Sequence, residues 1–200
     1  MKKPLLQVFV HIPKTGGTSF KKSCIVNNYK NSSIFNYRGL RHFALSSLRG
    51  VDFVDGHVGY GVHLMTHRKC EYFTLLRDPL DQAMSYYYFV RQSNSPSYKH
   101  PLLAEALNSS LIEFTKRYNN MQTRGIAGFG ANKMCDFSST ALVTIAKHVL
   151  FRRFKFYGFL DKFEDFCFKW SNEYSKPYKC IYESTKKTRN RPKLSGLASG

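Results

Sequence analysis

Two patterns of hydrophobic and polar positions alternate along the chain, one typical of buried strands and one of amphipathic helices. Short apolar runs rich in β-branched and aromatic residues predict strands at Leu5–Val10, Ile34–Tyr37, Val51–Gly61, Tyr72–Leu76 and Phe154–Leu160. Helical spacing of apolar residues predicts helices at Thr18–Asn27, Phe43–Leu48, Leu80–Arg91, Pro101–Tyr118, Thr140–Phe151 and Lys162–Tyr174. Strands that alternate with helices indicate an α/β fold with a central parallel sheet flanked by helices.

The chain shows no internal repeat and no domain boundary. Its 200 residues can bury a substantial core, and a content of 42% hydrophobic and 16% aromatic residues excludes wholesale disorder. We therefore expect one domain over residues 1–195. The small-residue tail 196–200 is expected to be disordered, and Asn120–Ala131 and the stretch around Ser93–Ser97 are expected to be loops.

The first predicted strand leads into a glycine-containing loop and then into a helix that we expect to begin with a hydroxyl cap. Such a loop binds anions, because its N–H groups and the helix dipole face the ligand. The residues expected to contact the anion supply one cation, two glycine backbones and three hydroxyls: Lys14, Thr15, Gly16, Gly17, Thr18 and Ser19. The alternative is an ordinary strand-turn-helix corner with an exposed lysine.

A second candidate segment follows the strand that ends at Leu76. Asp78 is expected to cap a helix whose first residue is Pro79, and Ser85 lies two turns further along. Ligands of open α/β sheets bind beyond the carboxyl ends of the strands, so Arg77 and Ser85 are expected to hold one phosphate. The alternative is a local salt bridge between Arg77 and Asp78.

Histidine is the natural base near neutral pH, and His57 is the best candidate because it lies toward the end of the predicted strand Val51–Gly61, among glycines. His63 is the reserve base, whereas His11 is expected to be structural. Asp55 either orients His57 or packs locally.

The charge balance points to anionic partners. Lys and Arg number 31 and Asp and Glu 13, a net charge of +18. One small anionic ligand at the loop would balance only about four charges. The excess therefore reflects either a further anionic partner or a solvated basic surface.

The five cysteines, with no C-x-x-C pair, are expected to be free thiols in a reducing compartment. We expect no membrane span and no metal. These features predict a cytoplasmic protein if the chain is complete.

The order Pro-Lys-Thr-Gly-Gly-Thr-Ser at residues 13–19 resembles the 5′-phosphosulfate loop of sulfotransferases that use 3′-phosphoadenosine 5′-phosphosulfate (PAPS). It differs from a Walker A loop, in which lysine follows the last glycine. The likeness is greatest to the carbohydrate group that includes heparan sulfate 2-O-sulfotransferase, and it runs from about Val8 to Pro192.

The resemblance implies a P-loop-NTPase-like sulfotransferase fold and a role for each matching residue. It implies that His57 is the catalytic base, that Lys14 stabilises the departing phosphate, and that Arg77 and Ser85 bind the 3′-phosphate. Gln82 departs from the family, which often has an arginine there. For an excised catalytic fragment, the resemblance implies a Golgi lumenal location.

Two later segments match less specifically. Gln122 and Arg124 lie in a segment similar to the family's Asn-x-Gln-Thr-Arg, and they either line the acceptor or donor cleft or fix a turn. Arg189 and Arg191 belong either to a loop that closes over the donor or to a solvated basic tail.

The predicted function is transfer of a sulfuryl group from PAPS to a hydroxyl, most plausibly of a saccharide that is itself anionic, with no nucleic acid as partner. Two rivals are a small-molecule kinase, disfavoured because no G-K-[ST] follows the loop, and a non-catalytic protein that binds polyanions.

Overall fold

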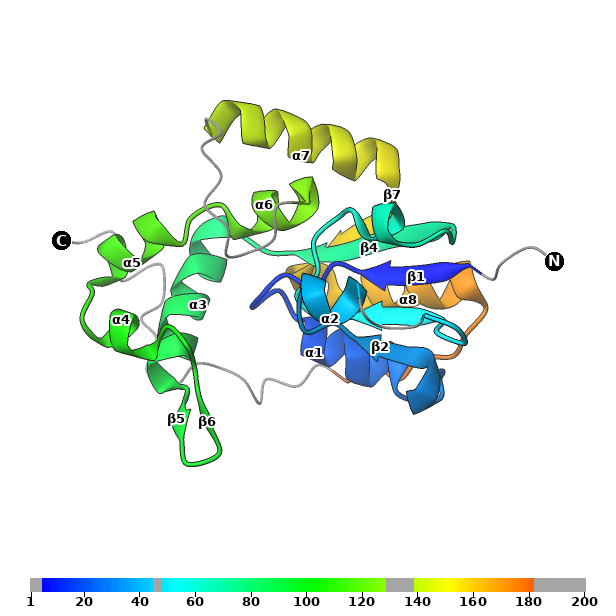
Figure 1. Cartoon of the computed structure of the whole chain (residues 1–200), viewed down its shortest axis with the longest axis horizontal. Helices are drawn as coiled ribbons and strands as arrows, with labels where there is room; N and C mark the ends of the chain where they lie inside the picture. Colours follow the sequence, from blue (N-terminus) through cyan, green and yellow to red (C-terminus); the bar gives the residue numbers. More distant parts are fainter. Residues whose placement is uncertain (1–4, 45–47, 129–138, 182–200) are drawn as a thin grey trace. The chain divides into compact units, whose positions relative to one another are not determined.

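The computed structural model of the chain describes residues 5–44, 48–128 and 139–181. They form two compact units (Figure 1). The sheet unit holds the described residues up to Leu76 and from Met121 onward, and the helical unit holds Arg77–Asn120. One domain over residues 1–195 stays a prediction, and the tail 196–200 lies outside the described residues.

The sheet unit is built on five parallel strands in the order β2-β3-β1-β4-β7. The strands are β1 Leu6–Phe9, β2 Ile34–Asn36, β3 Phe53–Asp55, β4 Cys70–Leu76 and β7 Phe154–Phe159. Every predicted strand is present, and the expected central parallel sheet flanked by helices is confirmed. The chain passes from β1 to the edge strand β2 and to β3, and then crosses to β4 and β7 on the other side of β1. The strand order therefore reverses at β1. Ligands of open α/β sheets bind at such a point.

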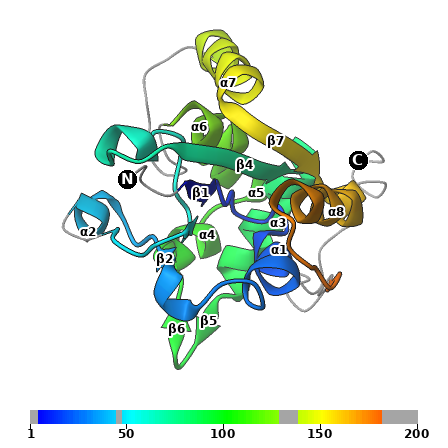
Figure 2. The same ribbon diagram turned by 90° about the vertical axis from the view of Figure 1, so that its right-hand side faces the viewer.

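Helices cover both faces of this sheet (Figure 2). Val8 and Val10 belong to a core that includes residues of α2, α6 and α7, whereas Phe9 belongs to a core with α1, the π-helix η1 and α8. This burial on both sides explains the continuous apolar run of the first strand. The helices are α1 Gly17–Phe20, η1 Lys21–Ile25, α2 Leu40–Ala44, α6 Met121–Ala127, α7 Ser139–Arg153 and α8 Phe163–Tyr174, with short 3₁₀ turns η2 Asn31–Ser33, η3 Val62–Met65 and η4 Leu160–Lys162.

The helical unit consists of α3 Pro79–Gln92, a hairpin of β5 Asn94–Ser95 and β6 Tyr98–Lys99, α4 Leu103–Leu107 and α5 Leu111–Arg117. As predicted, Asp78 caps α3 and accepts a hydrogen bond from the backbone of Asp81 at 2.8 Å. Tyr86 and Tyr87 are buried against the Phe114 ring, with centroids 6.0 and 5.4 Å away. Among the described residues, no helix has the length and apolar character needed to cross a bilayer.

Four local predictions were wrong. The first helix has no hydroxyl cap, because its N-cap is Gly16 in the left-handed region with φ 89°. Pro101–Tyr118 is two helices rather than one, because a capping box of Ser110 and Glu113 starts a new helix there. The expected loop after Asn120 contains α6, which includes Gly125, and the loop after α3 contains the β5–β6 hairpin.

We expect Ser110→Ala to destabilise the protein by about 1 kcal/mol, because the Ser110 hydroxyl accepts a hydrogen bond from the Glu113 N–H at 3.2 Å. Urea unfolding measures this change. Ser109→Ala is the matched control. The main-chain carbonyl of Ser109 accepts a hydrogen bond from the Tyr87 hydroxyl, and alanine keeps this carbonyl. Equal losses in the two variants would contradict the assignment.

Candidate functional site

The loop between β1 and α1 has an unusual backbone. Lys14 has a φ of 66° and Gly16 a φ of 89°, so two residues of this short loop lie in the left-handed region. The buried Thr15 hydroxyl donates to the carbonyl of Ile12 at 2.9 Å and closes the turn. A lysine in this conformation costs on the order of 1 kcal/mol, and such strain concentrates at functional sites.

A continuous helical segment starts directly after this loop, because α1 passes into η1 without a break from Gly17 to Ile25. The first amide groups of a helix have no acceptor inside the helix, so they favour an anion at this end. Gly17 is required by packing: a Cβ there would lie 2.1 to 2.8 Å from three atoms of the His11 ring. Ser19 is buried and Thr18 half-buried in the same first turn.

His57 is hydrogen-bonded to the backbone of this loop. Its Nδ1 lies 2.8 Å from the carbonyl oxygen of His11. A carbonyl only accepts, so Nδ1 carries the hydrogen and, in the neutral ring, Nε2 carries the lone pair. The exposed His57 ring lies 4.8 Å, centroid to centroid, from the ring of His11. The structure thus places the predicted base beside the predicted anion loop, in the tautomer that accepts a proton at Nε2.

Asp55, the last residue of β3, is the buried charge of this site. One oxygen, Oδ2, accepts from Lys21 Nζ at 2.7 Å, and Lys21 also donates to Asn36 Oδ1 at 2.9 Å. The other oxygen, Oδ1, is 3.6 Å from His11 Nδ1, beyond hydrogen-bonding distance. Burial opposes ionisation, yet the neighbouring His11 imidazole and the Lys21 ammonium outweigh it and lower the pKa of Asp55 to about 2. Lys21 is thus the hydrogen-bonded partner of Asp55.

The helix α6 carries Gln122 and Arg124 to the same part of the sheet unit. Its buried Gly125 packs against Ile12, which a Cβ would approach to 3.4 Å, and its carbonyl accepts from the backbone of Tyr60 at 3.0 Å. Gln122 and Arg124 are half-buried on this helix, next to the segment that joins β1 to Lys14. Their predicted part in lining a cleft stays a prediction.

Arg77 and Ser85 belong to the helical unit. Arg77 Nε donates to Asp81 Oδ2 at 2.6 Å, and a second guanidinium nitrogen is paired with the same oxygen. The partner of Arg77 is thus Asp81, one turn into α3, where the alternative interpretation expected Asp78. Ser85 and Gln82 are buried. That Arg77 and Ser85 share a ligand with the Lys14 loop stays a prediction.

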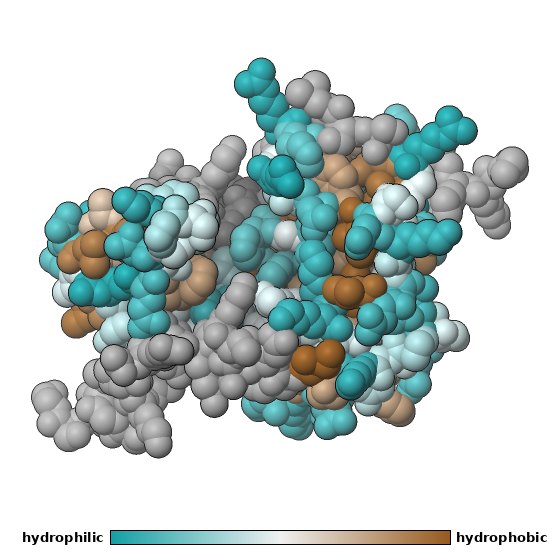
Figure 3. Space-filling model, turned by 90° about the horizontal axis from the view of Figure 1, so that it is seen from below, coloured by the Kyte–Doolittle hydropathy of each residue, from teal (hydrophilic) through white to brown (hydrophobic). Residues whose placement is uncertain are grey.

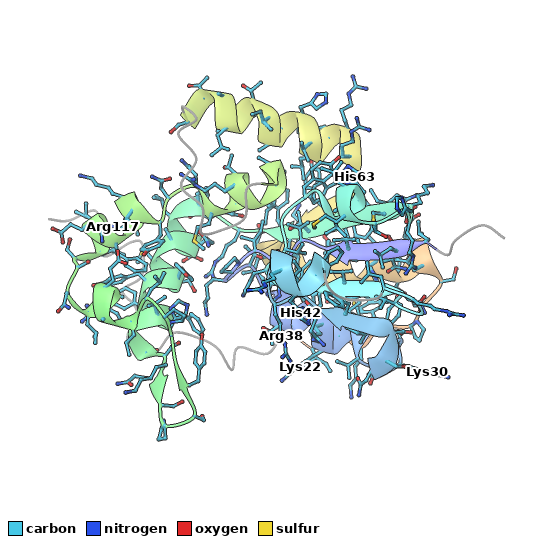
Figure 4. The ribbon with its side chains drawn as sticks, viewed as in Figure 1. Lys22, Lys30, Arg38, His42, His63 and Arg117 are labelled. Carbon is cyan, nitrogen blue, oxygen red and sulfur yellow. The ribbon has the colours of Figure 1, made fainter. Side chains whose placement is uncertain are left out.

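The reserve base, His63, is engaged elsewhere in the sheet unit. Its Nδ1 lies 2.9 Å from the hydroxyl of Tyr72, and burial together with the charge of Arg153 lowers its pKa. Figure 4 shows His63 near β4, away from Arg38 and His42, which lie toward β2. The candidates Arg189 and Arg191 lie outside the described residues.

Within the described ranges, Cys24, Cys70, Cys167 and Cys180 are free thiols, as expected. The same ranges contain no cluster of three or more side chains able to hold a metal ion.

The sequence did not identify two residues of this site. Lys21, on η1, was missed because its partners Asn36 and Asp55 come from the strands β2 and β3. No local sequence motif signals such a contact. His11 was expected to be structural, whereas it contacts the loop, Asp55 and His57. Its position directly before Ile12-Pro13-Lys14 was the available signal.

Comparisons with known proteins find likenesses among solved structures. No protein-family model and no curated protein sequence matches the chain. Among solved structures, the crystal structure of mouse sulfotransferase SULT7A1 complexed with PAP aligns with 100% of this chain and 68% of its own, at 14% sequence identity and a TM-score of 0.47. A likeness of that size carries no argument about this chain, so the function is argued from the site.

We expect Asp55→Asn to lower the free energy of unfolding at neutral pH by roughly 2 kcal/mol, the equivalent of lowering its pKa from 3.8 to about 2. A lowered pKa stabilises the fold above the unfolded value, and this stabilisation is lost as pH falls from about 4 to about 2. Urea titrations between pH 2 and pH 7 should show the wild-type and variant curves converging at the acid end. A constant gap across this range would contradict the assignment.

Proposed function

We propose that this protein is a sulfotransferase that moves a sulfuryl group from PAPS to a hydroxyl of a saccharide. The observation that carries the proposal is the hydrogen bond of His57 to the strained Lys14 loop, at the carboxyl end of the central strand. This contact joins a base to an anion-binding loop, the combination that sulfuryl transfer needs.

The roles follow from chemistry. His57 Nε2 takes the proton of the acceptor hydroxyl while the acceptor oxygen forms a bond to sulfur. The bond between sulfur and the phosphate oxygen breaks, and Lys14 stabilises the charge left on the phosphate. The Thr15 hydroxyl holds the loop closed through its bond to Ile12. The first-turn amides and the hydroxyls of Thr18 and Ser19 are proposed to donate hydrogen bonds to the sulfuryl oxygens. Positioning and electrostatics supply the catalysis, as in phosphoryl transfer.

The remaining candidate residues bind the two substrates. Arg77 and Ser85 are proposed to hold the 3′-phosphate, for which Arg77 would exchange or share its contact with Asp81. Gln122 and Arg124 are proposed to face the acceptor. Arg189 and Arg191 are proposed to close over the donor.

A basic edge of the sheet unit supports an anionic acceptor. Arg38 follows β2 by two residues, and the exposed Arg41 and His42 lie on α2. Figure 4 shows Arg38 and His42 near α2. We call Arg38, Arg41 and His42 the basic edge.

The described carboxylates of the first three strands do not offset this edge. No acidic residue precedes Asp52 in the sequence, Asp52 precedes β3 and thus lies at the amino end of the strands, and Asp55 is buried and paired. Figure 3 shows hydrophilic residues on this side of the sheet unit, with hydrophobic residues among them. A negatively charged chain would therefore meet positive charge at Arg38 and Arg41.

We expect 3′-phosphoadenosine 5′-phosphate (PAP) to raise the unfolding temperature where ATP and inorganic sulfate do not. A ligand at a hundred times its Kd adds about 2.7 kcal/mol of stability. Lys14→Ala and Arg77→Ala should abolish the shift, because each removes a phosphate contact. His57→Ala should keep the shift but lose transfer of labelled sulfate from PAPS.

Lys30→Ala is the matched control, an exposed lysine of the same unit whose loss should leave the PAP shift intact. A shift with ATP and none with PAP would favour the kinase, and no shift with either would favour the polyanion-binding protein. Unchanged turnover in His57→Ala would exclude it as the base.

For the acceptor, we expect the Arg38→Ala/Arg41→Ala double variant to bind fluorescent polygalacturonate about fivefold more weakly, since two surface charge contacts are worth about 1 kcal/mol together. Its affinity should also fall less steeply with salt, because fewer counterions are released. Fluorescence anisotropy at several salt concentrations measures both.

The matched control is Lys147→Ala/Arg152→Ala, which removes the same charge from exposed positions of α7. An equal loss of affinity in this control would show that net charge, and not the basic edge, determines binding.

A further inference from the structure

Two histidines of the site share one local geometry. The backbone N–H of Ile12 bonds to the carbonyl of Val10 at 3.1 Å, and that of Val58 bonds to the carbonyl of Gly56 at 2.7 Å. Each contact spans three residues and defines a γ-turn, with His11 at the centre of one and His57 at the centre of the other. Both imidazoles thus project from tight turns at the ends of neighbouring parallel strands, β1 and β3.

The two turns are joined by the bond from His57 Nδ1 to the His11 carbonyl. The His11 side chain determines where that carbonyl lies, because its ring fills the space over the Cα of Gly17 and is largely buried, with 17% of the side chain exposed. A shift of the His11 ring would therefore move the acceptor of the hydrogen bond that orients His57.

Asp55 is placed to hold the His11 ring. Its Oδ1 is buried, with 9% of the Asp55 side chain exposed, and no residue in the described part of the chain donates a hydrogen bond to it. A buried carboxylate oxygen without a donor is costly. The closest ring atom is His11 Nδ1, at 3.6 Å, while Lys21 occupies Oδ2. A small rotation of the His11 ring would bring its Nδ1–H onto this oxygen.

We propose that His11 and Asp55 are positioning residues for His57. The buried carboxylate of Asp55 orients the His11 ring, the ring fixes the γ-turn, and the carbonyl of that turn holds His57 with hydrogen on Nδ1 and the lone pair on Nε2. The inference rests on the proposed function, in which Nε2 accepts the proton.

Charges on the packed elements bear on His57 in different directions. Asp55 of β3 favours the protonated imidazole, whereas Lys21 of η1 and Lys14 of the loop oppose it. Removal of the Asp55 charge should therefore move the acid limb of the pH–rate profile to lower pH. A purely structural defect would lower the rate without moving that limb.

The test is the tautomer of His57, read from the ¹⁵N chemical shifts of its ring in the whole chain. The wild type should carry hydrogen on Nδ1. Asp55→Asn and His11→Gln should shift the population toward hydrogen on Nε2 and lower kcat on the order of 10- to 100-fold, with KM for PAPS unchanged. If Asp55→Asn unfolds, His11→Gln carries the same comparison.

Tyr29→Phe is the matched control, since it removes a half-buried side-chain hydrogen bond to Gln7 in the same unit without touching either histidine. It should lower stability and leave both the tautomer and the pH profile unchanged. A His57 tautomer that stays on Nδ1 in Asp55→Asn and His11→Gln would overturn the proposal. A shifted tautomer in a protein that transfers no sulfate, even as wild type, would uphold the positioning and refute the proposed function.

Discussion

The burial of β1 on both faces is the constraint on which the rest of this structure depends. Val8 and Phe9 point into two separate cores, so the central strand cannot slide or turn without emptying one of them. The end of β1 is therefore a fixed point. The loop that starts there can hold Lys14 in an unfavourable conformation because the strand before it and the helix after it are both anchored.

The site is assembled from strand ends rather than from one motif. β1 supplies the loop, β2 supplies Asn36, and β3 supplies Asp55 and leads to His57. Parallel pairing brings these ends to the same edge, and one lysine, Lys21, links two of them through side-chain hydrogen bonds. Register errors in any of the three strands would separate groups that must meet within 3 Å.

The strands were predictable because each carries a short apolar run, and helical spacing of apolar residues located most helices. The points where helices begin and end were harder to predict. Ser110 interrupts a helical pattern by local capping, and Gly125 lies inside a helix because its missing side chain allows close packing on Ile12. The loop and His57 could be proposed from the sequence because the residues that suggest them are neighbours in the chain, and their roles stay predictions. Lys21 and the role of His11 depend on contacts across strands, which one sequence does not reveal.

The π-helical turn after α1 lets one helical segment contact both the polar strand ends and the aromatic core. In an α-helix Lys21 and Ile25 would stack on one face, four residues apart. Here the chain makes a wider turn, closed by a bond from the Val26 N–H to the Lys21 carbonyl. Lys21 reaches the polar strand ends, while Ile25 is fully buried in the aromatic core. The one extra residue of the π-helical turn thus keeps the Lys21 ammonium away from the hydrophobic core that holds Ile25. Deletion of a single residue here would bring Lys21 and Ile25 onto the same helix face.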